Sequence, residues 1–340
     1  MVELEKVLSI QTYSGEEWRM FAFIVRECKR LGVDVTQDEH GNLYITKGVS
    51  STYPCVVAHM DSVHKIGKDL SIIEHNGVMT GFNYATMQQS GIGGDDKVGI
   101  YIGLRCLEEY DAIKLAFFVD EERGCIGSGG ADMSFFDDCR FVLQADRRGN
   151  TDFVVNASGT KLSSKKFKKA VRPLIADYGY SFSDGMMTDV MQLKQNGLKV
   201  SCANISCGYY RPHAVDEYVV VEHVETCLDM FITLIDNMED VYEHTYSPPS
   251  YYGRYSWDDR SYAPVGGYGW SYKDKPSAST YKPKYVSYWD EIDTAWDWRK
   301  KEDEVAYHCD NCNEVQTTHD LTYNNNYNAF LCKDCHSIYA

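Results

Sequence analysis

The pattern of hydrophobic and polar residues predicts an α/β domain in about the first 242 residues of the chain. Apolar residues at helical spacing predict helices at residues 15–31, 95–109, 164–177, 188–195 and 222–241. Short apolar runs predict strands at residues 33–36, 43–46, 54–58, 114–119, 140–144 and 200–204. Pro173 is expected to kink or shorten the third of these helices. The predicted fold class is α/β, with a central, mostly parallel or mixed sheet flanked by helices.

Acidic residues and histidines follow several of the predicted strands. His59, Glu122 and Asp146 each come shortly after a fully apolar run. In open α/β sheets, ligands bind in the crevice outside the carboxyl ends of the strands. We therefore expect side chains that are far apart in the sequence to converge in one crevice.

Five short segments carry the residue types that bind zinc. They are His59-Met60-Asp61, Gly93-Gly94-Asp95-Asp96-Lys97, Asp120-Glu121-Glu122, Ala145-Asp146 and Arg211-Pro212-His213. Imidazole nitrogen and carboxylate oxygen are zinc ligands, and two zinc ions about 3.5–4 Å apart can activate a water and stabilise an oxyanion. Each segment alone is more often structural, because paired acids, for example, are favoured at helix starts. The hypothesis of a metal site rests on their order and spacing together.

Taken together, these segments resemble the superfamily of co-catalytic zinc exopeptidases. That superfamily includes tripeptide aminopeptidase (peptidase T), the glutamate carboxypeptidases and the bacterial leucyl aminopeptidases. The resemblance covers about the first 240 residues. Its most specific pieces are Ala58-His59-Met60-Asp61, Gly94-Asp95-Asp96-Lys97-Val98-Gly99 and Asp120-Glu121-Glu122-Arg123-Gly124.

The resemblance implies two zinc ions at the active site, with cobalt or manganese suited to similar ligands. The implied ligands are His59, Asp95, Glu122, Asp146 and His213. Asp95 would bridge the two metals, and Asp96 is the alternative bridging residue. Glu121 would be the general base that passes a proton from water to the leaving amine. Asp61 would fix the ring orientation of His59.

The spacing between the implied ligands differs from that of many relatives, which carry an inserted second domain. Here 35 residues lie between His59 and Asp95, and 66 lie between Asp146 and His213. Neither gap holds a full domain. We therefore expect no inserted lid domain, a more open site and, as the simplest state, a monomer.

Three further residues are considered for substrate binding. Arg147 and Arg148 follow Asp146, where either could hold a substrate carboxylate in bidentate geometry or both could be surface charge. Tyr210, with its neighbour Tyr209, could donate to the oxyanion, although packing is the more common role for a tyrosine in this tyrosine-rich chain.

The composition changes abruptly after about Thr245. The stretch to Lys300 holds five of the six tryptophans and five of the eight prolines. We interpret it as a partly ordered linker, although its aromatic residues could also dock on the catalytic domain or stack on bases. The predicted organisation is a catalytic domain over residues 1–244, a linker over 245–303 and a small C-terminal segment over 304–340.

Four of the 12 cysteines form two Cys-x-x-Cys pairs in the C-terminal segment. Cys309 and Cys312 are separated from Cys332 and Cys335 by 19 residues, a spacing typical of a four-cysteine structural zinc site. The segment resembles a zinc ribbon, with strands expected at residues 305–308 and 329–331. Redox pairs are the alternative, but no thioredoxin-like helix follows either pair. The segment lacks a basic cluster, so a protein partner is favoured over nucleic acid.

Charge and the N-terminal sequence bear on partners and location. The formal net charge is −16, which disfavours nucleic acid and anionic membranes as partners. The sequence begins without the basic and apolar regions of a signal peptide, and no apolar run is long enough to cross a bilayer. We therefore expect a cytoplasmic protein with reduced thiols.

The leading functional hypothesis is an aminopeptidase that acts on short peptides through a zinc-activated water. A carboxypeptidase or an N-acyl amino acid deacylase on the same scaffold is the nearest alternative. A third hypothesis, from another class, is a non-catalytic metal-binding protein that uses the C-terminal ribbon as an interaction module. The presence of Glu121 beside the full ligand set argues against that third hypothesis.

Overall fold

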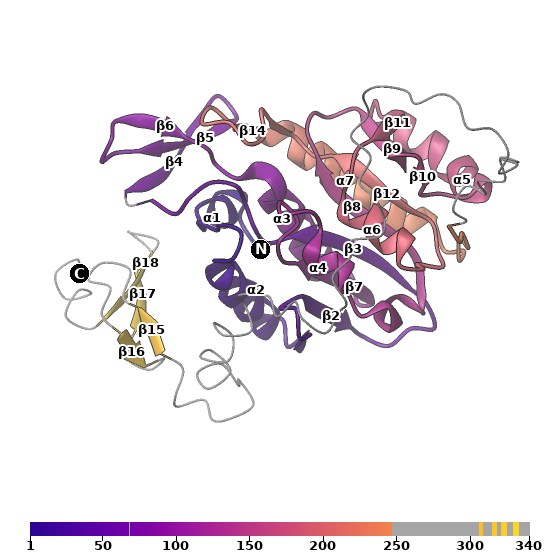
Figure 1. The fold of residues 1–340 in the computed structure, drawn as a ribbon, viewed down its shortest axis with the longest axis horizontal. Coiled ribbons are helices and arrows are strands. Elements are labelled where there is room, and N and C mark those ends of the chain that lie inside the picture. The colour runs from indigo at the N-terminus through magenta and orange to yellow at the C-terminus, as the bar shows by residue number, and fades with distance from the viewer. Residues whose placement is uncertain (68, 247–305, 309–314, 318–320, 325–328, 333–340) are drawn as a thin grey trace, which may run out of the picture. The chain divides into compact units, whose positions relative to one another are not determined.

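The computed structural model describes residues 1–67, 69–246, 306–308, 315–317, 321–324 and 329–332 (Figure 1). The chain divides into two compact units, Met1–Gly253 and Arg254–Ala340. The helices of the first unit are α1 (Leu4–Leu8), α2 (Trp18–Arg30), α3 (Gly94–Glu109), α4 (Ile126–Gly129), the 3-10 helix η1 (Met133–Phe136), α5 (Lys165–Ala176), α6 (Asp189–Gln195) and α7 (Val221–Asn237). Its strands are β1 (Val35–Gln37), β2 (Leu43–Lys47), β3 (Tyr53–His59), β4 (Leu70–His75), β5 (Val78–Asn83), β6 (Gln88–Ser90), β7 (Ile113–Phe118), β8 (Cys139–Arg147), β9 (Asp152–Ala157), β10 (Thr160–Lys161), β11 (Ser181–Gly185), β12 (Cys202–Ser206), β13 (Tyr209–Tyr210) and β14 (Tyr218–Val220).

A nine-stranded mixed sheet forms the centre of the first unit, in the order β1-β2-β7-β3-β8-β12-β9-β10, with β11 paired to β9. Strands β7, β3, β8 and β12 are mutually parallel, whereas β1, β2, β9 and β10 pair with their neighbours in this order in the antiparallel sense. The α/β class with a mixed central sheet is therefore confirmed. Because the four parallel strands share one direction, their carboxyl ends meet at one edge of the sheet.

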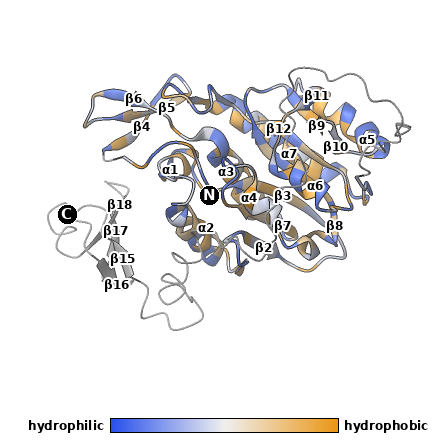
Figure 2. Ribbon diagram, in the orientation of Figure 1, coloured by the Kyte–Doolittle hydropathy of each residue, from blue (hydrophilic) through white to orange (hydrophobic). Residues whose placement is uncertain are grey.

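Hydrophobic side chains alternate between the two faces of this sheet. In β3, Val56 and Ala58 belong to the core cluster that also contains side chains of α1, α2, α3, α5 and α7. Cys55 and Val57 point to the opposite face and pack in a second cluster with side chains of η1 and α6. Both faces of the strand are thus covered, which explains its uninterrupted apolar sequence. Figure 2 shows the same contrast, with hydrophobic residues on the central strands and hydrophilic residues on outer elements such as α5.

A second, five-stranded sheet lies at one end of the first unit (Figure 1). Its strands β4, β5 and β6 come from the segment between His59 and Asp95, for which the sequence analysis predicts no element. β14 joins this sheet by pairing antiparallel with β5, Val219 opposite Met79. Residues flanking the His213 loop are therefore held next to the segment that leads to Asp95.

The predicted elements of the first unit are all present, with shifted ends. The predicted helix at residues 164–177 runs through Pro173 and ends at Ala176, one residue before its predicted end. The expectation that Pro173 shortens this helix is therefore wrong. The helix predicted from residue 95 is helical only from Lys97, because Asp95 and Asp96 have non-helical backbone angles. These two residues belong to the turn that precedes the helix.

The described strands near the C-terminus form two antiparallel hairpins. β15 (Ala306–His308) pairs with β16 (Val315–Thr317), and β17 (Leu321–Asn324) pairs with β18 (Ala329–Cys332). Strands were expected at two of these four places. Cys309, Cys312 and Cys335 lie outside the described residues, and of Cys332 only the strand position is described, so the zinc-ribbon interpretation stays a prediction. No helix among the described residues combines the length and apolar character needed to cross a membrane.

Candidate metal centre

His59 is the last residue of β3 and lies at the carboxyl edge of the central sheet. Its side chain is fully buried, and Nδ1 lies 3.1 Å from the backbone carbonyl oxygen of Asp61 and 3.3 Å from Oδ1 of the same residue. This contact fixes the ring, so that Nε2 points at Oδ1 of Asp95, 3.1 Å away. The register of β3 and β8 places Val57 opposite Gln144, which brings Asp146, two residues further along β8, level with His59.

Asp95 and Asp96 are adjacent but have different surroundings. Oδ1 of Asp95 faces His59, and Oδ2 lies 3.4 Å from Nε2 of His213. Asp96 instead accepts hydrogen bonds from the backbone amides of Gly99, at 3.0 Å, and His59, at 3.2 Å. One oxygen of Asp96 is therefore engaged with the backbone of α3 and the other with the backbone at the end of β3. Of the two, Asp95 is the residue that lies between the histidines.

Asp61 braces the acidic turn after β7. Its Oδ1 accepts a hydrogen bond from the backbone amide of Glu121 at 2.9 Å, and its Oδ2 accepts from the amide of Glu122 at 3.3 Å and from Ser14 Oγ at 2.7 Å. Asp120, which opens the turn, has a positive φ of 52°. One buried carboxylate thus contacts the ring of His59 and holds the backbone of both glutamates, a wider role than the predicted orientation of His59 alone.

Asp146 is held by a network of polar side chains. Oδ1 accepts from the hydroxyl of Tyr209 at 3.2 Å, and Oδ2 accepts from Thr188 Oγ1 and Gln144 Nε2, each at 3.2 Å. Its backbone amide donates to Oδ1 of Asn204 at 3.0 Å. These hydrogen bonds fix the orientation of the side chain, while burial, with the charge of Asp95, raises the pKa of Asp146 to about 7.

His213 lies in the loop between β13 and β14, where its φ is 64° and that of Arg211 is 56°. Positive φ is strained in a residue with a side chain, and such strain is concentrated at functional sites. Nε2 of His213 lies 2.9 Å from Oε1 of Glu122. The side chain of His213 is 52% exposed, whereas that of His59 is 0% exposed. The cluster is therefore closed on the His59 side and open on the His213 side.

The five predicted ligands form two groups of three that share Asp95. Ligand atoms of His59, Asp95 and Asp146 lie within 4.8 Å of one another, and so do those of Asp95, Glu122 and His213. Two atoms that bind one zinc ion tetrahedrally at about 2.0–2.1 Å are about 3.3 Å apart. The four imidazole–carboxylate separations in the two groups are 3.1, 3.7, 3.4 and 2.9 Å. The arrangement therefore fits a pair of cations without rearrangement of the backbone.

The hydrogen bonding and electrostatics of the cluster fit cations as well. Oε1 of Glu122 is buried and faces Nε2 of His213 at 2.9 Å, so its close contact is with a group that can carry positive charge. Hydrogen bonding with Asp95 and Glu122 raises the pKa of His213 to about 10. Burial lowers the pKa of His59, but its hydrogen bonds with Asp146, Asp61 and Asp95 outweigh burial and hold that pKa well above its usual range. The carboxylates thus create a field that favours positive charge at the centre of the cluster.

Glu121 lies beside both groups and belongs to neither. Its Oε2 is 3.9 Å from Nε2 of His59, and its Oε1 accepts a hydrogen bond from Cys125 Sγ at 3.3 Å. Burial, together with the nearby acids Asp189, Asp146 and Asp95, raises the pKa of Glu121 to about 9 although the charge of His59 opposes this shift. Divalent cations beside this carboxyl would lower its pKa again. Glu121 is therefore placed to exchange a proton at the edge of the cluster.

A separate group of three buried acids, Glu17, Asp61 and Asp120, shares no residue with the two ligand groups. Burial and then the charge of Asp61 raise the pKa of Glu17 to about 8. Glu17 therefore keeps its proton at neutral pH, which removes one negative charge from this interior group.

The residues considered for substrate binding differ in their placement. Arg147 donates through Nε to Asp152 at 2.7 Å, whereas Arg148 is exposed. The hydroxyl of Tyr210 lies 2.8 Å from Nδ1 of His223, in a contact that does not support a role at the cluster. Tyr209 is the tyrosine that reaches the cluster, through Asp146. The substrate-binding assignments of Arg147, Arg148 and Tyr210 stay predictions.

Several residues of the site have no signal in the sequence. Gln144, Thr188 and Asn204 orient Asp146, and Glu217 contacts the turn that holds Asp95. These residues are brought together by strand register and loop packing. Residue type and spacing alone do not separate them from ordinary surface residues.

No family model and no curated protein matches the chain. The fold is similar to that of the aminopeptidase PepT from Bacillus cereus, with a TM-score of 0.58 and 14% identity over 69% of this chain and 96% of that chain. It is also similar to a tripeptidase from Staphylococcus aureus, with a TM-score of 0.54 and 14% identity over 68% of this chain and 95% of that chain. A TET peptidase from Pyrococcus horikoshii has a TM-score of 0.50 and 14% identity over 68% of this chain and 98% of that chain, and it can assemble into a tetrahedron or a large octahedral shell.

At these identities the similarity concerns the fold. The oligomeric state of this chain is not determined by the assembly of a distant neighbour, so the monomer stays a prediction. The fold nevertheless matches that of the aminopeptidase over 96% and that of the tripeptidase over 95% of their own chains. The chain therefore has the fold of the aminopeptidase PepT and of this tripeptidase, which agrees with the peptidase T-like resemblance of its sequence.

Proposed function

We propose that this protein is a metal-dependent exopeptidase, and more narrowly an aminopeptidase that acts on short peptides. The observation that carries the proposal is the position of Asp95, whose two oxygens face His59 at 3.1 Å and His213 at 3.4 Å. A carboxylate shared by two ligand groups is what a two-metal hydrolytic site requires. The metals would be held by His59, Asp95 and Asp146 on one side and by Asp95, Glu122 and His213 on the other.

Bound divalent cations would supply Lewis-acid chemistry, which lowers the pKa of water and polarises the scissile carbonyl. The chain's own residues supply the proton transfer. Glu121 accepts the proton of the attacking water and delivers it to the nitrogen of the leaving amine as the peptide bond breaks. Because Glu121 lies outside both ligand groups, its carboxylate stays available for this exchange.

The residues behind the cluster keep the reacting groups in place. Asp61 fixes the His59 ring and the acidic turn, and Tyr209 and Thr188 fix Asp146. Rigid support of this kind keeps ligands and base within the narrow geometry that catalysis needs. The open side of the cluster is the half-exposed His213, so one end of a peptide can approach from solvent.

The choice of an aminopeptidase is supported by the neighbours of the fold, which are an aminopeptidase and a tripeptidase in their own descriptions. We further propose zinc as the metal, since the ligands are imidazoles and carboxylates at about the separation that zinc favours. A cytoplasmic location and a structural zinc at Cys309, Cys312, Cys332 and Cys335 belong to the same proposal and rest on the sequence alone.

The test uses three forms of one tripeptide, free at both ends, acetylated at the amine or amidated at the carboxyl end. Purified protein reconstituted with zinc should release the N-terminal residue from the free and the amidated peptides and leave the acetylated peptide intact. Cleavage confined to the acetylated peptide would reject the aminopeptidase in favour of a carboxypeptidase or deacylase. Bound metal with no hydrolysis of any form would reject peptidase activity on such substrates altogether.

A further inference from the structure

Glu217 is a fully buried carboxylate with no part in the proposed chemistry. Its Oε2 accepts a hydrogen bond from the backbone amide of Gly93 at 2.8 Å and lies 2.7 Å from Nε2 of His64. Its Oε1 accepts from the backbone amide of Asp95 at 3.2 Å. Burial of a carboxylate is costly unless hydrogen bonds compensate. Of the three partners of Glu217, Asp95 is a predicted metal ligand, and Gly93 and His64 lie in segments next to predicted ligands.

Glu217 belongs to the same loop as His213. The loop is closed on itself by hydrogen bonds from the amide of Glu217 to the carbonyl of Ala214, at 3.1 Å, and from the amide of Ala214 to the carbonyl of Arg211, at 3.3 Å. The carboxylate of Glu217 therefore connects this compact loop directly to the amide of Asp95. It thus links the loop that carries His213 to Asp95, the ligand that the two groups share.

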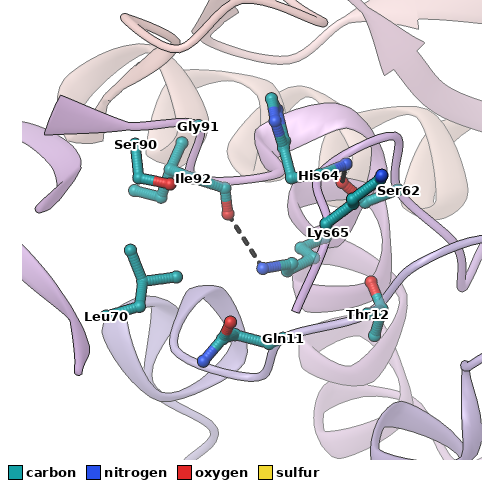
Figure 3. Close-up of a pocket in the computed structure, with 10 residues that line it drawn as sticks. Gln11, Thr12, Ser62, His64, Lys65, Leu70, Ser90, Gly91 and Ile92 are labelled. Carbon is teal, nitrogen blue, oxygen red and sulfur yellow. Dashed lines mark hydrogen bonds between the residues drawn. The ribbon is translucent and has the colours of Figure 1, made fainter. Parts of the chain in front are cut away.

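The turn at residues 91–95, which donates two hydrogen bonds to Glu217, is closely packed against neighbouring side chains. A Cβ atom at Gly91 would lie 1.9 Å from the ring of His64, and one at Gly94 would lie 2.8 Å from Cβ of Tyr209. Gly93 has a φ of 66°, and a Cβ there would lie 2.8 Å from Cε of Lys97. A side chain at any of these three positions would displace neighbouring atoms, so the close packing of the turn depends on glycine. Figure 3 shows the nearby part of this region, where Ser62, His64 and Gly91 line a small pocket.

The opposite side of the turn is anchored by Lys97. This buried lysine donates through Nζ to the carbonyl of Leu8 at 2.9 Å and to the carbonyl of Ile92 at 2.8 Å. The turn is thus held both by Lys97 and by the carboxylate of Glu217, which belongs to the His213 loop. Lys97 fixes the turn to the end of α1, whereas Glu217 connects it to the loop that carries His213.

We propose that Glu217, supported by His64, is a positioning residue that sets the separation between His213 and Asp95 and thereby shapes the second metal position. The inference rests on the proposed function, because it assumes that both residues bind metal. The first position, with His59 on β3 and Asp146 on β8, takes its geometry from the central sheet. The second position takes its geometry from a loop, and Glu217 is the contact that fixes this loop against the shared ligand.

This asymmetry distinguishes a positioning role from a merely structural one. If Glu217 only stabilises the fold, its loss should lower thermal stability and weaken both metal positions alike. If it positions His213 against Asp95, its loss should weaken one position far more than the other. Contacts that orient metal ligands typically change metal affinity by about 10- to 100-fold when they are removed.

The experiment is a calorimetric zinc titration of full-length, metal-stripped protein in the wild-type form and as Glu217→Gln. Glutamine keeps the size of the side chain and one carbonyl acceptor, but it loses the second acceptor and the charge. We expect the weaker of the two active-site dissociation constants to rise about 10- to 100-fold and the tighter one to change by less than about threefold. Binding at the C-terminal cysteines is common to all variants and cancels in the comparison. Cobalt-loaded protein should show a changed d–d absorption spectrum in the variant.

Asp216→Asn is the matched control, because Asp216 pairs with Arg211 at 2.8 Å on the surface of the same loop. It should leave both dissociation constants unchanged. His64→Gln removes one contact of Glu217 and should weaken the same position by a smaller factor, which decides the matter if Glu217→Gln does not fold. Unchanged constants in both variants, or equal weakening of both metals, would overturn the proposal.

Failure of the proposed function looks different. Wild-type protein that binds two metals at the cluster but hydrolyses no peptide would reject the peptidase, while the titration would still decide the role of Glu217. Active wild-type protein with an unaltered Glu217→Gln titration would reject only the positioning role.

Discussion

Replacement of Glu121 by glutamine should lower turnover by about 10²- to 10⁴-fold and leave metal binding intact. Glutamine occupies the same volume and can still accept the hydrogen bond from Cys125 Sγ, which lies 3.3 Å from Oε1. The amide cannot take up a proton, so the variant loses the base and little else. Oε2 lies 3.9 Å from Nε2 of His59, and Glu121 belongs to neither of the two ligand groups around Asp95, so neither group loses a ligand.

The magnitude follows from the role. A positioned general base contributes about 10²- to 10⁴-fold to the rate, which corresponds to about 2.7–5.4 kcal/mol of transition-state stabilisation. We expect kcat on a tripeptide to fall within this range. Because binding of the peptide does not require the base, KM should change by less than about threefold. Metal content, measured by mass spectrometry of the purified proteins, should equal that of the wild type.

Glu39→Gln is the control, because Glu39 is also a glutamate but its side chain is 91% exposed. Its kcat should match the wild type. A Glu121→Gln variant with kcat within threefold of the wild type would refute the assignment of the base. A variant that loses metal together with activity would show that Glu121 is a ligand, contrary to the separation of roles deduced from the structure.

Three further predictions concern stability, substrate binding and metal removal. Glu17→Gln should stabilise the protein above about pH 8, because the folded state holds the proton of Glu17 up to a pKa of about 8 whereas the unfolded chain releases it near 4.5. That contribution is fully present below pH 4.5 and is lost as pH rises to about 8. Urea denaturation should therefore show a shallower pH dependence in the variant, by on the order of 5 kcal/mol. Arg148→Ala should raise KM for peptides with a free carboxylate several-fold, while Arg147→Ala, which breaks the contact with Asp152, should change KM less; equal effects would contradict the distinction. A chelator should lower Tm by several degrees, and added zinc should restore it, because ligands that bind the folded state stabilise it; an unchanged Tm would argue against metal at the buried cluster.

Much of the fold and of the ligand set follows from local sequence. The apolar runs that end at His59 and before Asp120 are buried strands. Because binding sites of open α/β sheets lie at the carboxyl ends of the strands, the sequence predicts that the residues after these runs converge. The turn before Asp95 stands out in the sequence by its glycines. The structure explains them, because close packing against His64, Lys97 and Tyr209 excludes side chains there. These features depend on short stretches of chain, so the sequence carries them.

Other parts of the structure depend on contacts that local sequence does not carry. Strands β4, β5 and β6 are only half-buried and lack a strong apolar pattern, and the pairing of β14 with β5 joins residues about 140 positions apart. Glu217 is buried and Asp216 is partly exposed, although the two are adjacent acids in the same loop. Only the position of the loop against the turn distinguishes them. Likewise, the regular helical backbone of α3 begins after Asp95 and not at the predicted residue 95, and Asp95 faces the two histidines from the preceding turn.

The central claim is that two cations lie on either side of Asp95. Anomalous diffraction from crystals grown with zinc tests it directly, since each bound ion gives a separate peak. We predict a pair of peaks about 3.5–4 Å apart, one within bonding distance of His59 and Asp146 and the other within bonding distance of Glu122 and His213. The absence of a peak at this cluster, or a single peak that Asp95 does not touch, would contradict the account.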